Sequence, residues 1–513
     1  VTAMHNFYFL KLDRGLIVFF FLLSRSIAPI FGQFQLDQSF GDNGVVISND
    51  EQTRRIRAIR VLSNEKILVV GLGKNEDNNN MVVGLKYHAN GTLDTAFGEN
   101  GKLRYEIEGN ISPYSFIEGD DGSILILCIA NASGRLVKFN ENGSLDVSFG
   151  NNGFYEFPQS LVSEFFALEK DILGRYIVGG SVGDSALILA LKQNGELDTS
   201  FGNGGIRTEG IDDFATVYSV VILNDNSILA GGTAYDNGGL FPNSYFFLTK
   251  YDGNGIKDES FGVSGSRFTD FHEYTADWCN KVIPMPNGDL VCGGGTSSSI
   301  HLLTRIDSLG NHNSNFAENG LAFNPTIPMH FQHGLIFYLN IIISCGTVAT
   351  ENGENQFAVV SLDENGSNIS LDTIDLGTIN DWAVCMTPAE NGKLLIAGGS
   401  MPDGEKFRFS MCKVELFNND IQYKEFPIHS ELAIFPNPIE SEGIVELNVP
   451  TWNEPIKLIL QNVNGQVLLN KVIMPKESRS INIELNVGDY LYSIFDRKGT
   501  QLNSGRLIVI NRN

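Results

Sequence analysis

The residues best suited to acid–base chemistry stand together in the stretch FHEYTADW, where His272 is followed directly by Glu273. An imidazole and a carboxylate can move protons if both reach the same bound substrate. Adjacent side chains of an extended chain usually point apart, so the stretch favours a solvated loop over a catalytic pair. The sequence contains no GxSxG elbow, HExxH pair, Walker loop or SxDxGxTW box. We therefore predict no catalytic residue.

Cysteine and histidine do not indicate a metal site. Cys128, Cys292 and Cys345 lie in apolar runs, where a free thiol behaves as a small hydrophobic group. The six cysteines form no CxxC pair and no Cys/His cluster with the spacing of zinc ligands. The sequence thus predicts free thiols, no metal and no cofactor.

Charge and length bound the class of partner. The chain of 513 residues carries 36 Lys and Arg against 60 Asp and Glu, a formal net charge of −24. This excess of acid opposes a phosphate backbone, whose binding depends on releasing counterions to basic side chains, so nucleic acid is not an expected partner. A chain of this length, 42% hydrophobic, can bury large cores and should form at least two domains.

Residues 1–32 have the order of a secretory signal peptide. Lys11 and Arg14 precede the apolar run GLIVFFFLL, and a polar break with small residues follows it. The run has about half of the roughly 20 residues that cross a bilayer, which disfavours a retained anchor. We expect the segment to be removed, leaving a mature protein without a membrane span.

One dodecamer recurs along most of the chain: NGTLDTAFGENG returns as NGSLDVSFGNNG, NGELDTSFGNGG and NGIKDESFGVSG. Its phenylalanines are spaced 57, 52, 52, 60 and 55 residues apart. The NG pair suits a tight turn, and the Asp can accept backbone N–H bonds as an Asx turn. We predict that each ring fills a gap between neighbouring repeats. The rings are those of Phe40, Phe97, Phe149, Phe201, Phe261 and Phe316.

Four short β segments fit into each repeat. In the first repeat they are VVI, IRAIRVL, ILVVG and MVVGLKY, and polar turns such as SNEK join the second segment to the third. Seven apolar runs, most of them ending in Gly, recur along the chain. This pattern predicts an all-β, seven-bladed β-propeller of four-stranded blades over residues 33–417. The sequence leaves open which strand is innermost and how the ring closes.

The repeated NGxLDxSFGxxG, followed by an apolar strand ending in GG, resembles the delta-60 repeat of bacterial exported β-propellers. Two copies depart from this pattern. The sixth has Ala317 in place of Gly, and the seventh, NGSNISLDTIDLG, lacks the Phe. The seventh blade is therefore the least well defined by the sequence.

A different module follows a polar linker at residues 418–430. Residues 431–513 alternate short strands and turns, which predicts a small immunoglobulin-like β-sandwich. The segment resembles the C-terminal sorting domain of the type IX secretion system of Bacteroidetes. The matching residues include Pro436, Asn437, Pro438, Gly488 and Tyr490. The resemblance implies export through the periplasm by the type IX secretion machinery, to the medium or the outer cell surface. An adhesive or carbohydrate-binding sandwich is the alternative.

The long variable loops are the predicted recognition surface. If the four segments alternate in direction, short repetitive turns lie on one face of the propeller and variable loops on the other, where binding residues are expected. The residues that we single out are Tyr235, Asp236, Phe241, Asp270, His272, Glu273 and Tyr274. The sequence favours a monomeric, non-catalytic module that binds an extracellular glycan, protein or surface polymer. The alternative is a polysaccharide hydrolase or lyase with carboxylates meeting in the central channel.

Overall fold

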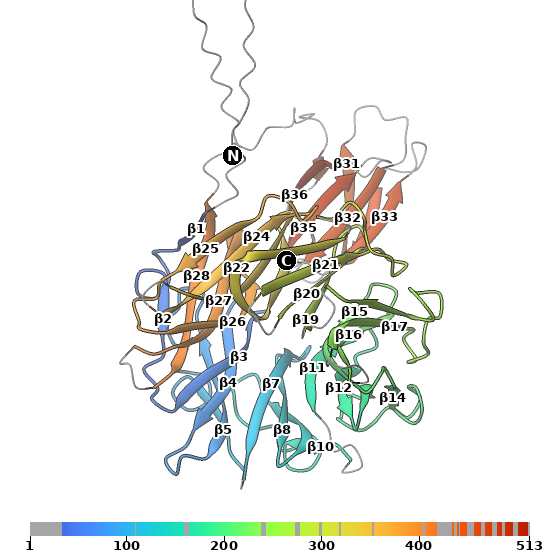
Figure 1. Cartoon of the computed structure of the whole chain (residues 1–513). Helices are drawn as coiled ribbons and strands as arrows, with labels where there is room; N and C mark the ends of the chain where they lie inside the picture. The colour runs from blue at the N-terminus through green and yellow to red at the C-terminus, as the bar shows by residue number, and fades with distance from the viewer. Residues whose placement is uncertain are drawn as a thin grey trace, which may run out of the picture.

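The computed structural model describes the propeller from residue 33 to 417, except 108, 159–163, 238–242, 272–276, 297–299, 318–319, 351–352 and 403–405, and after residue 432 only the strands β29 to β36. The chain forms seven four-stranded antiparallel blades around a central channel (Figure 1). The seven-bladed propeller that the repeat predicts is thereby confirmed. The described part of the chain contains no helix with the length and apolar character needed to cross a membrane.

Each blade starts with the strand that lines the channel. These innermost strands are β3 (Thr53–Val61), β7 (Ile111–Glu118), β11 (Phe165–Lys170), β15 (Phe214–Ile222), β19 (Asp277–Pro284), β22 (Leu321–Tyr338) and β26 (Asp381–Pro388). The second strands are β4 (Ile67–Lys74), β8 (Ile124–Ala130), β12 (Tyr176–Val182), β16 (Ile228–Asp236), β20 (Leu290–Thr296), β23 (Ile341–Ala349) and β27 (Lys393–Ser400). The third strands are β5 (Asn80–Tyr87), β9 (Ser133–Phe139), β13 (Ser185–Leu191), β17 (Asn243–Tyr251), β21 (Ile300–Ile306), β24 (Asn355–Asp363) and β28 (Arg408–Phe417).

The short strand after each dodecamer forms the outer edge of a blade. These strands are β6 (Lys102–Tyr105), β10 (Phe154–Glu156), β14 (Ile206–Glu209), β18 (Ser266–Thr269) and β25 (Ser370–Ile374). Each one therefore completes the blade before it, whereas the sequence repeat places it at the start of the next unit. In the fifth blade the outer edge is the first half of β22, whose second half is the inner strand of the sixth blade.

The N-terminal strands complete the last blade and close the ring. Strand β2 (Val45–Ile47) pairs with β28, as Val45 opposite Cys412, and forms the outer edge of the seventh blade. Strand β1 (Gln33–Leu36) pairs with the end of β28, as Leu36 opposite Val414. Hydrogen bonds between the two ends of the propeller sequence therefore close the ring. The sequence alone left open how the ring closes.

The dodecamer phenylalanines lie between blades. Phe97, for example, belongs to a buried cluster with Val70 of the first blade and Ile126 of the second. All six rings are at most 4% exposed, and each belongs to a cluster made by two successive blades. The six cysteines are buried and unpaired, as expected of small hydrophobic groups.

The strands after residue 432 form two sheets. The first contains β29 (Ala433–Phe435), β31 (Glu442–Asn448) and β34 (Ser480–Glu484). The second contains β30 (Ile439–Glu440), β36 (Gln501–Ile510), β35 (Gly488–Phe495), β32 (Ile456–Asn462) and β33 (Val467–Ile473). Leu458, Leu460 and Ile494 of the second sheet are buried. The immunoglobulin-like arrangement of the two sheets stays a prediction.

Candidate binding site

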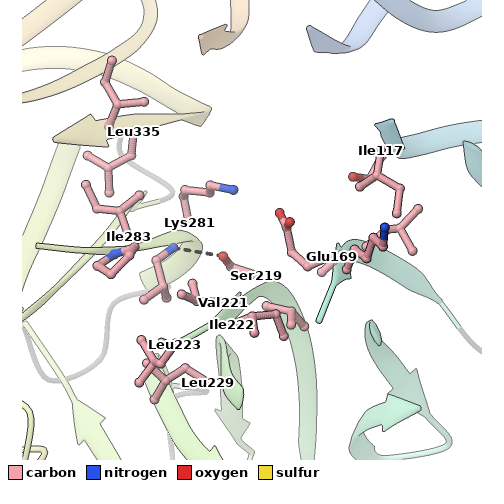
Figure 2. A pocket seen from close by; sticks show the side chains of 18 of the residues that line it. Ile117, Glu169, Ser219, Val221, Ile222, Leu223, Leu229, Lys281, Ile283 and Leu335 are labelled. Atoms are coloured by element: carbon pink, nitrogen blue, oxygen red, sulfur yellow. Dashed lines mark hydrogen bonds between the residues drawn. The ribbon is translucent and has the colours of Figure 1, made fainter. Parts of the chain in front are cut away.

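A cavity of about 1690 Å³ fills the central channel. Its walls are the seven innermost strands, and it continues between the turns that join first and second strands, such as the turn at Asp171 and Leu173. These turns share one face with the dodecamers, and we call it the dodecamer face. In the wall between the fourth and fifth blades, Ser219 Oγ accepts a hydrogen bond from the Val282 N–H at 3.1 Å (Figure 2).

Every innermost strand has an irregularity in its pairing register, and in five blades the residue that the register skips lines this channel. The pairing register skips Arg57 in β3, Tyr114 in β7, Phe166 in β11 and Tyr218 in β15. It also skips Asn280 in β19. In β22 the register skips two residues, and in β26 it skips one residue, which does not line the cavity. A bulge leaves one residue without a partner and re-aims its side chain. All five of the named residues line the cavity.

In most blades a glycine at the end of the apolar run accommodates the bulge; in the second blade Cys128 stands at this position. In the fourth blade the residue before the bulge, Val217, pairs with Gly232. A Cβ atom on Gly232 would lie 1.9 Å from the Thr216 carbonyl oxygen. At Gly71, Gly180, Gly294 and Gly398 an added Cβ atom would likewise lie 1.6 to 2.1 Å from a backbone carbonyl oxygen in or just before the innermost strand. At these five positions glycine leaves room for the inner-strand backbone.

Three of the bulge residues form a continuous line of aromatic rings. The ring centroids of Tyr114 and Phe166 are 5.0 Å apart, and those of Phe166 and Tyr218 are 4.7 Å apart. Beyond Tyr218, the Trp278 Nε1–H donates a hydrogen bond to the Tyr235 hydroxyl at 3.0 Å. We call these five residues the aromatic arc. All five rings are half-buried. Tyr114, Phe166, Tyr218 and Trp278 line the cavity, where a ligand can contact them, whereas Tyr235 does not.

The phenols of the arc stay neutral at physiological pH. Burial raises the pKa of Tyr114, Tyr218 and Tyr235, and the phenol of Tyr235 raises that of Tyr218 further. A neutral phenol both donates and accepts a hydrogen bond. The arc therefore combines apolar ring faces with hydroxyl groups, the usual lining of a site for an uncharged polar ligand.

Basic side chains lie next to the arc inside the channel. The Arg57 guanidinium stacks over the Tyr114 ring, 5.4 Å from its centroid. Arg60 forms an ion pair with Glu169 at 3.4 Å and donates a hydrogen bond from Nε to the Phe116 carbonyl at 2.8 Å. Figure 2 shows Lys281 and Glu169 reaching into the same open space from β19 and β11.

None of the predicted site residues that the structure describes lines this channel. Tyr235 belongs to the arc, Asp236 is exposed at the end of β16, and Asp270 is exposed and accepts a hydrogen bond from Asn243 Nδ2 at 2.9 Å. Phe241, His272, Glu273 and Tyr274 lie outside the described residues, as do Pro436, Asn437 and Pro438. Gly488 and Tyr490 lie in β35. Their proposed roles stay predictions.

The other arc residues were missed by sequence reasoning, although a signal exists. Tyr114, Phe166 and Tyr218 are spaced 52 residues apart, the same interval that separates Phe97, Phe149 and Phe201. Aromatic residues that recur at the repeat period in innermost strands occupy the same level of the channel.

Comparisons with known proteins agree with a propeller and give no activity. A family model described as a domain of unknown function (DUF5122) beta-propeller matches residues 120–149. None of the curated proteins compared with the chain matches it.

Several solved structures are similar at low identity. A protein of unknown function from Dyadobacter fermentans is 13% identical, with a TM-score of 0.43, over 73% of this chain and 99% of that one. Virginiamycin B lyase from Staphylococcus aureus is 11% identical, with a TM-score of 0.42, over 75% of this chain and 100% of the lyase chain. A puromycin hydrolase is 12% identical, with a TM-score of 0.41, over 87% of this chain and 59% of the hydrolase chain.

Proposed function

We propose that the chain is an exported propeller that binds a saccharide chain along the aromatic arc without turning it over. The observation that carries the proposal is the row of half-buried rings from Tyr114 through Phe166 to Tyr218, inside a cavity of about 1690 Å³. Sugar rings have apolar C–H faces that pack on aromatic rings, and their hydroxyls match the phenols of the arc. A concave channel suits such a ligand better than the broad surface of a protein partner.

The carboxylates of the channel favour binding over hydrolysis. Glu169 is paired with Arg60, and Glu118 accepts two hydrogen bonds at 2.8 Å from Ser63, from its N–H and its hydroxyl. Glycoside hydrolysis needs two carboxyl groups facing the scissile bond, one as an acid and one as a base or nucleophile. The other described lining carboxylates also have partners, namely Asp120 with Lys170, Asp171 with Arg175 and Asp225 with Ser227.

Removing the central ring of the arc tests the binding site. Phe166→Ala should weaken saccharide binding about tenfold or more, because burying one ring contributes about 1.5–3 kcal/mol. Phe268→Ala is the matched control, since Phe268 is 43% exposed on the outer strand β18. Binding is measured first on a glycan array and then by calorimetry. If no glycan binds, or if the two variants bind alike, the proposal is wrong.

Export is the second part of the proposal. It is supported by the apolar run before residue 33 and by the resemblance of residues 431–513 to a type IX sorting domain. The mature protein would then act as a monomer in the medium or on the outer cell surface. Deleting residues 431–513 should leave a folded propeller in the periplasm, which cell fractionation detects. Normal levels of the truncated protein outside the cell would refute the sorting role.

A further inference from the structure

Positive charge gathers in the middle of the channel, although the formal net charge of the chain is −24. At and just below the level of the bulges, the charged residues that line the cavity are Arg57, Arg60 and Lys281 against Glu169 alone. The remaining acidic lining residues lie at the dodecamer face, where they have the partners named above. The middle of the channel is therefore cationic, and Glu169 neutralises only one of its three basic side chains.

Arg57 lacks an anionic partner in the described structure. Among the described residues its guanidinium forms no hydrogen bond or ion pair, and its Nε is buried without an acceptor. Burial lowers the pKa of Arg57, and the neighbouring Arg55 lowers it further, because both disfavour a charge at this position. A buried donor without an acceptor destabilises the protein unless a ligand supplies one.

Lys281, on the opposite side of the channel, resembles Arg57 in lacking a direct anionic partner among the described residues. Burial lowers the pKa of its ammonium group, and Glu169 acts on it only through space. The Glu169 carboxylate is paired with Arg60 instead, and Lys281 forms no direct ion pair with any described residue. Its side chain extends into open channel in Figure 2.

The two cations flank the aromatic arc. Arg57 lies on the first blade and stacks on Tyr114, the first ring of the arc. Lys281 lies on the fifth blade, in the same strand as Trp278, the last ring of the arc. A ligand that covers the rings from end to end therefore meets a positive charge at each end.

We infer that the channel binds an anionic saccharide, whose sugar faces lie on the aromatic arc and whose repeated acidic groups lie against Arg57 and Lys281. The inference rests on the proposed function and adds the class of ligand to it. Carboxylate and sulfate groups share the needed chemistry, because both accept hydrogen bonds from guanidinium and ammonium groups. A neutral saccharide would leave both cations unpaired.

Matched probes separate the charge from the sugar. The probes are a galacturonate tetrasaccharide, its carboxyl-reduced neutral counterpart, and a sulfated galactan tetrasaccharide. The parent protein should bind at least one charged probe about tenfold or more tightly than the neutral one, and added salt should reduce this preference. The charged probe that binds more tightly shows whether the channel prefers carboxylate or sulfate groups.

Variants then assign the preference to the two cations. Lys281→Met and Arg57→Met should each weaken binding of the charged probe about tenfold, while the affinity for the neutral probe should change less than about twofold. Lys281→Arg should retain the preference, and Lys192→Met, on an exposed lysine, is the matched control. Phe166→Ala should weaken all the probes that bind, because it acts through the sugar face.

The outcomes distinguish the two proposals. If neutral and charged probes bind equally, or if Lys281→Met does not change binding of the charged probe, the inference of an anionic ligand is wrong. The proposed saccharide site would not be affected by either result. Binding of none of the probes or array glycans would overturn both. Thermal melting of each variant identifies any that fails to fold, and if Lys281→Met fails to fold, Arg57→Met supplies the test in its place.

Discussion

At the scale of single residues, the dodecamer aspartate joins a turn, a strand and a blade interface. Asp37 accepts hydrogen bonds from Ser39, at 3.1 Å from the N–H and 2.6 Å from the hydroxyl, and pairs with Lys393 at 2.8 Å. Lys413 lies over the Phe40 ring, 5.5 Å from its centroid. Aspartates in other copies repeat the bonds to a following Ser and a basic strand residue, at Asp146, Asp198 and Asp258. The repeated Asp, Ser and Phe therefore form one structural unit.

This unit should make the propeller sensitive to acid. Burial alone would raise the pKa of Asp37, but the hydrogen bonds from Lys393 and Ser39 lower it to about 2. The unfolded value is about 3.9, so the stabilisation is complete above that pH and is lost as the pH falls toward 2. The free energy involved is about 2 kcal/mol for this one group. Asp37→Asn should remove it.

Melting temperatures between about pH 2 and pH 6 check this prediction. The parent protein should lose more stability on acidification than Asp37→Asn does, so the two curves converge at low pH. Asp42→Asn, on an exposed residue of the same loop, is the control. Parallel curves for the parent and Asp37→Asn would show that the carboxylate contributes nothing specific.

At the scale of elements, the bulged inner strand and the glycine opposite it depend on each other. Gly232→Ala would place a Cβ atom 1.9 Å from the Thr216 carbonyl oxygen, a backbone atom that cannot rotate away. We expect a loss of about 3 kcal/mol or more, at the upper end of the overpacking range, and a displaced Tyr218. Gly210→Ala is the matched control, because an added Cβ there would meet nothing within 4 Å. Denaturant unfolding compares the two variants, and equal stability would refute the interpretation.

The same pair of elements shows what the sequence can and cannot predict. The blade count follows from the seven apolar runs, and phenylalanines such as Phe97, Phe149 and Phe201 recur because each fills one interface between blades. The bulges do not follow, because a one-residue shift in register leaves the apolar pattern of a strand almost unchanged. Glycines such as Gly232 were visible as a signature, but sequence alone suggests a turn rather than a close backbone approach. The aromatic arc was therefore missed, since aromatic residues in apolar strands resemble core residues.

At the scale of the whole molecule, ring closure depends on an interface that the repeat does not fill. In the sixth blade the Asn365-Gly366 turn is followed closely by β25, and the seventh copy has no Phe. Phe34 of β1 occupies this place instead, in a buried cluster with Phe357 of the sixth blade and Ile396 of the seventh. Asp372 of β25 also accepts a hydrogen bond from the Phe34 N–H. One N-terminal strand thus contacts both blades that meet at the closure.

Phe34→Ala should therefore open the ring locally. Losing this ring leaves a cavity in the closing interface and should cost about 3–5 kcal/mol, as large-to-small aromatic substitutions in cores do. Phe149→Ala, between the second and third blades, should cost a similar amount. The two variants differ in where the damage lies, since each interface joins a different pair of blades. Amide hydrogen exchange should accelerate in β1, β25 and β28 for Phe34→Ala, and in β8 and β12 for Phe149→Ala. If both variants accelerate exchange evenly around the ring, the blades unfold as one unit and β1 is not a local clasp.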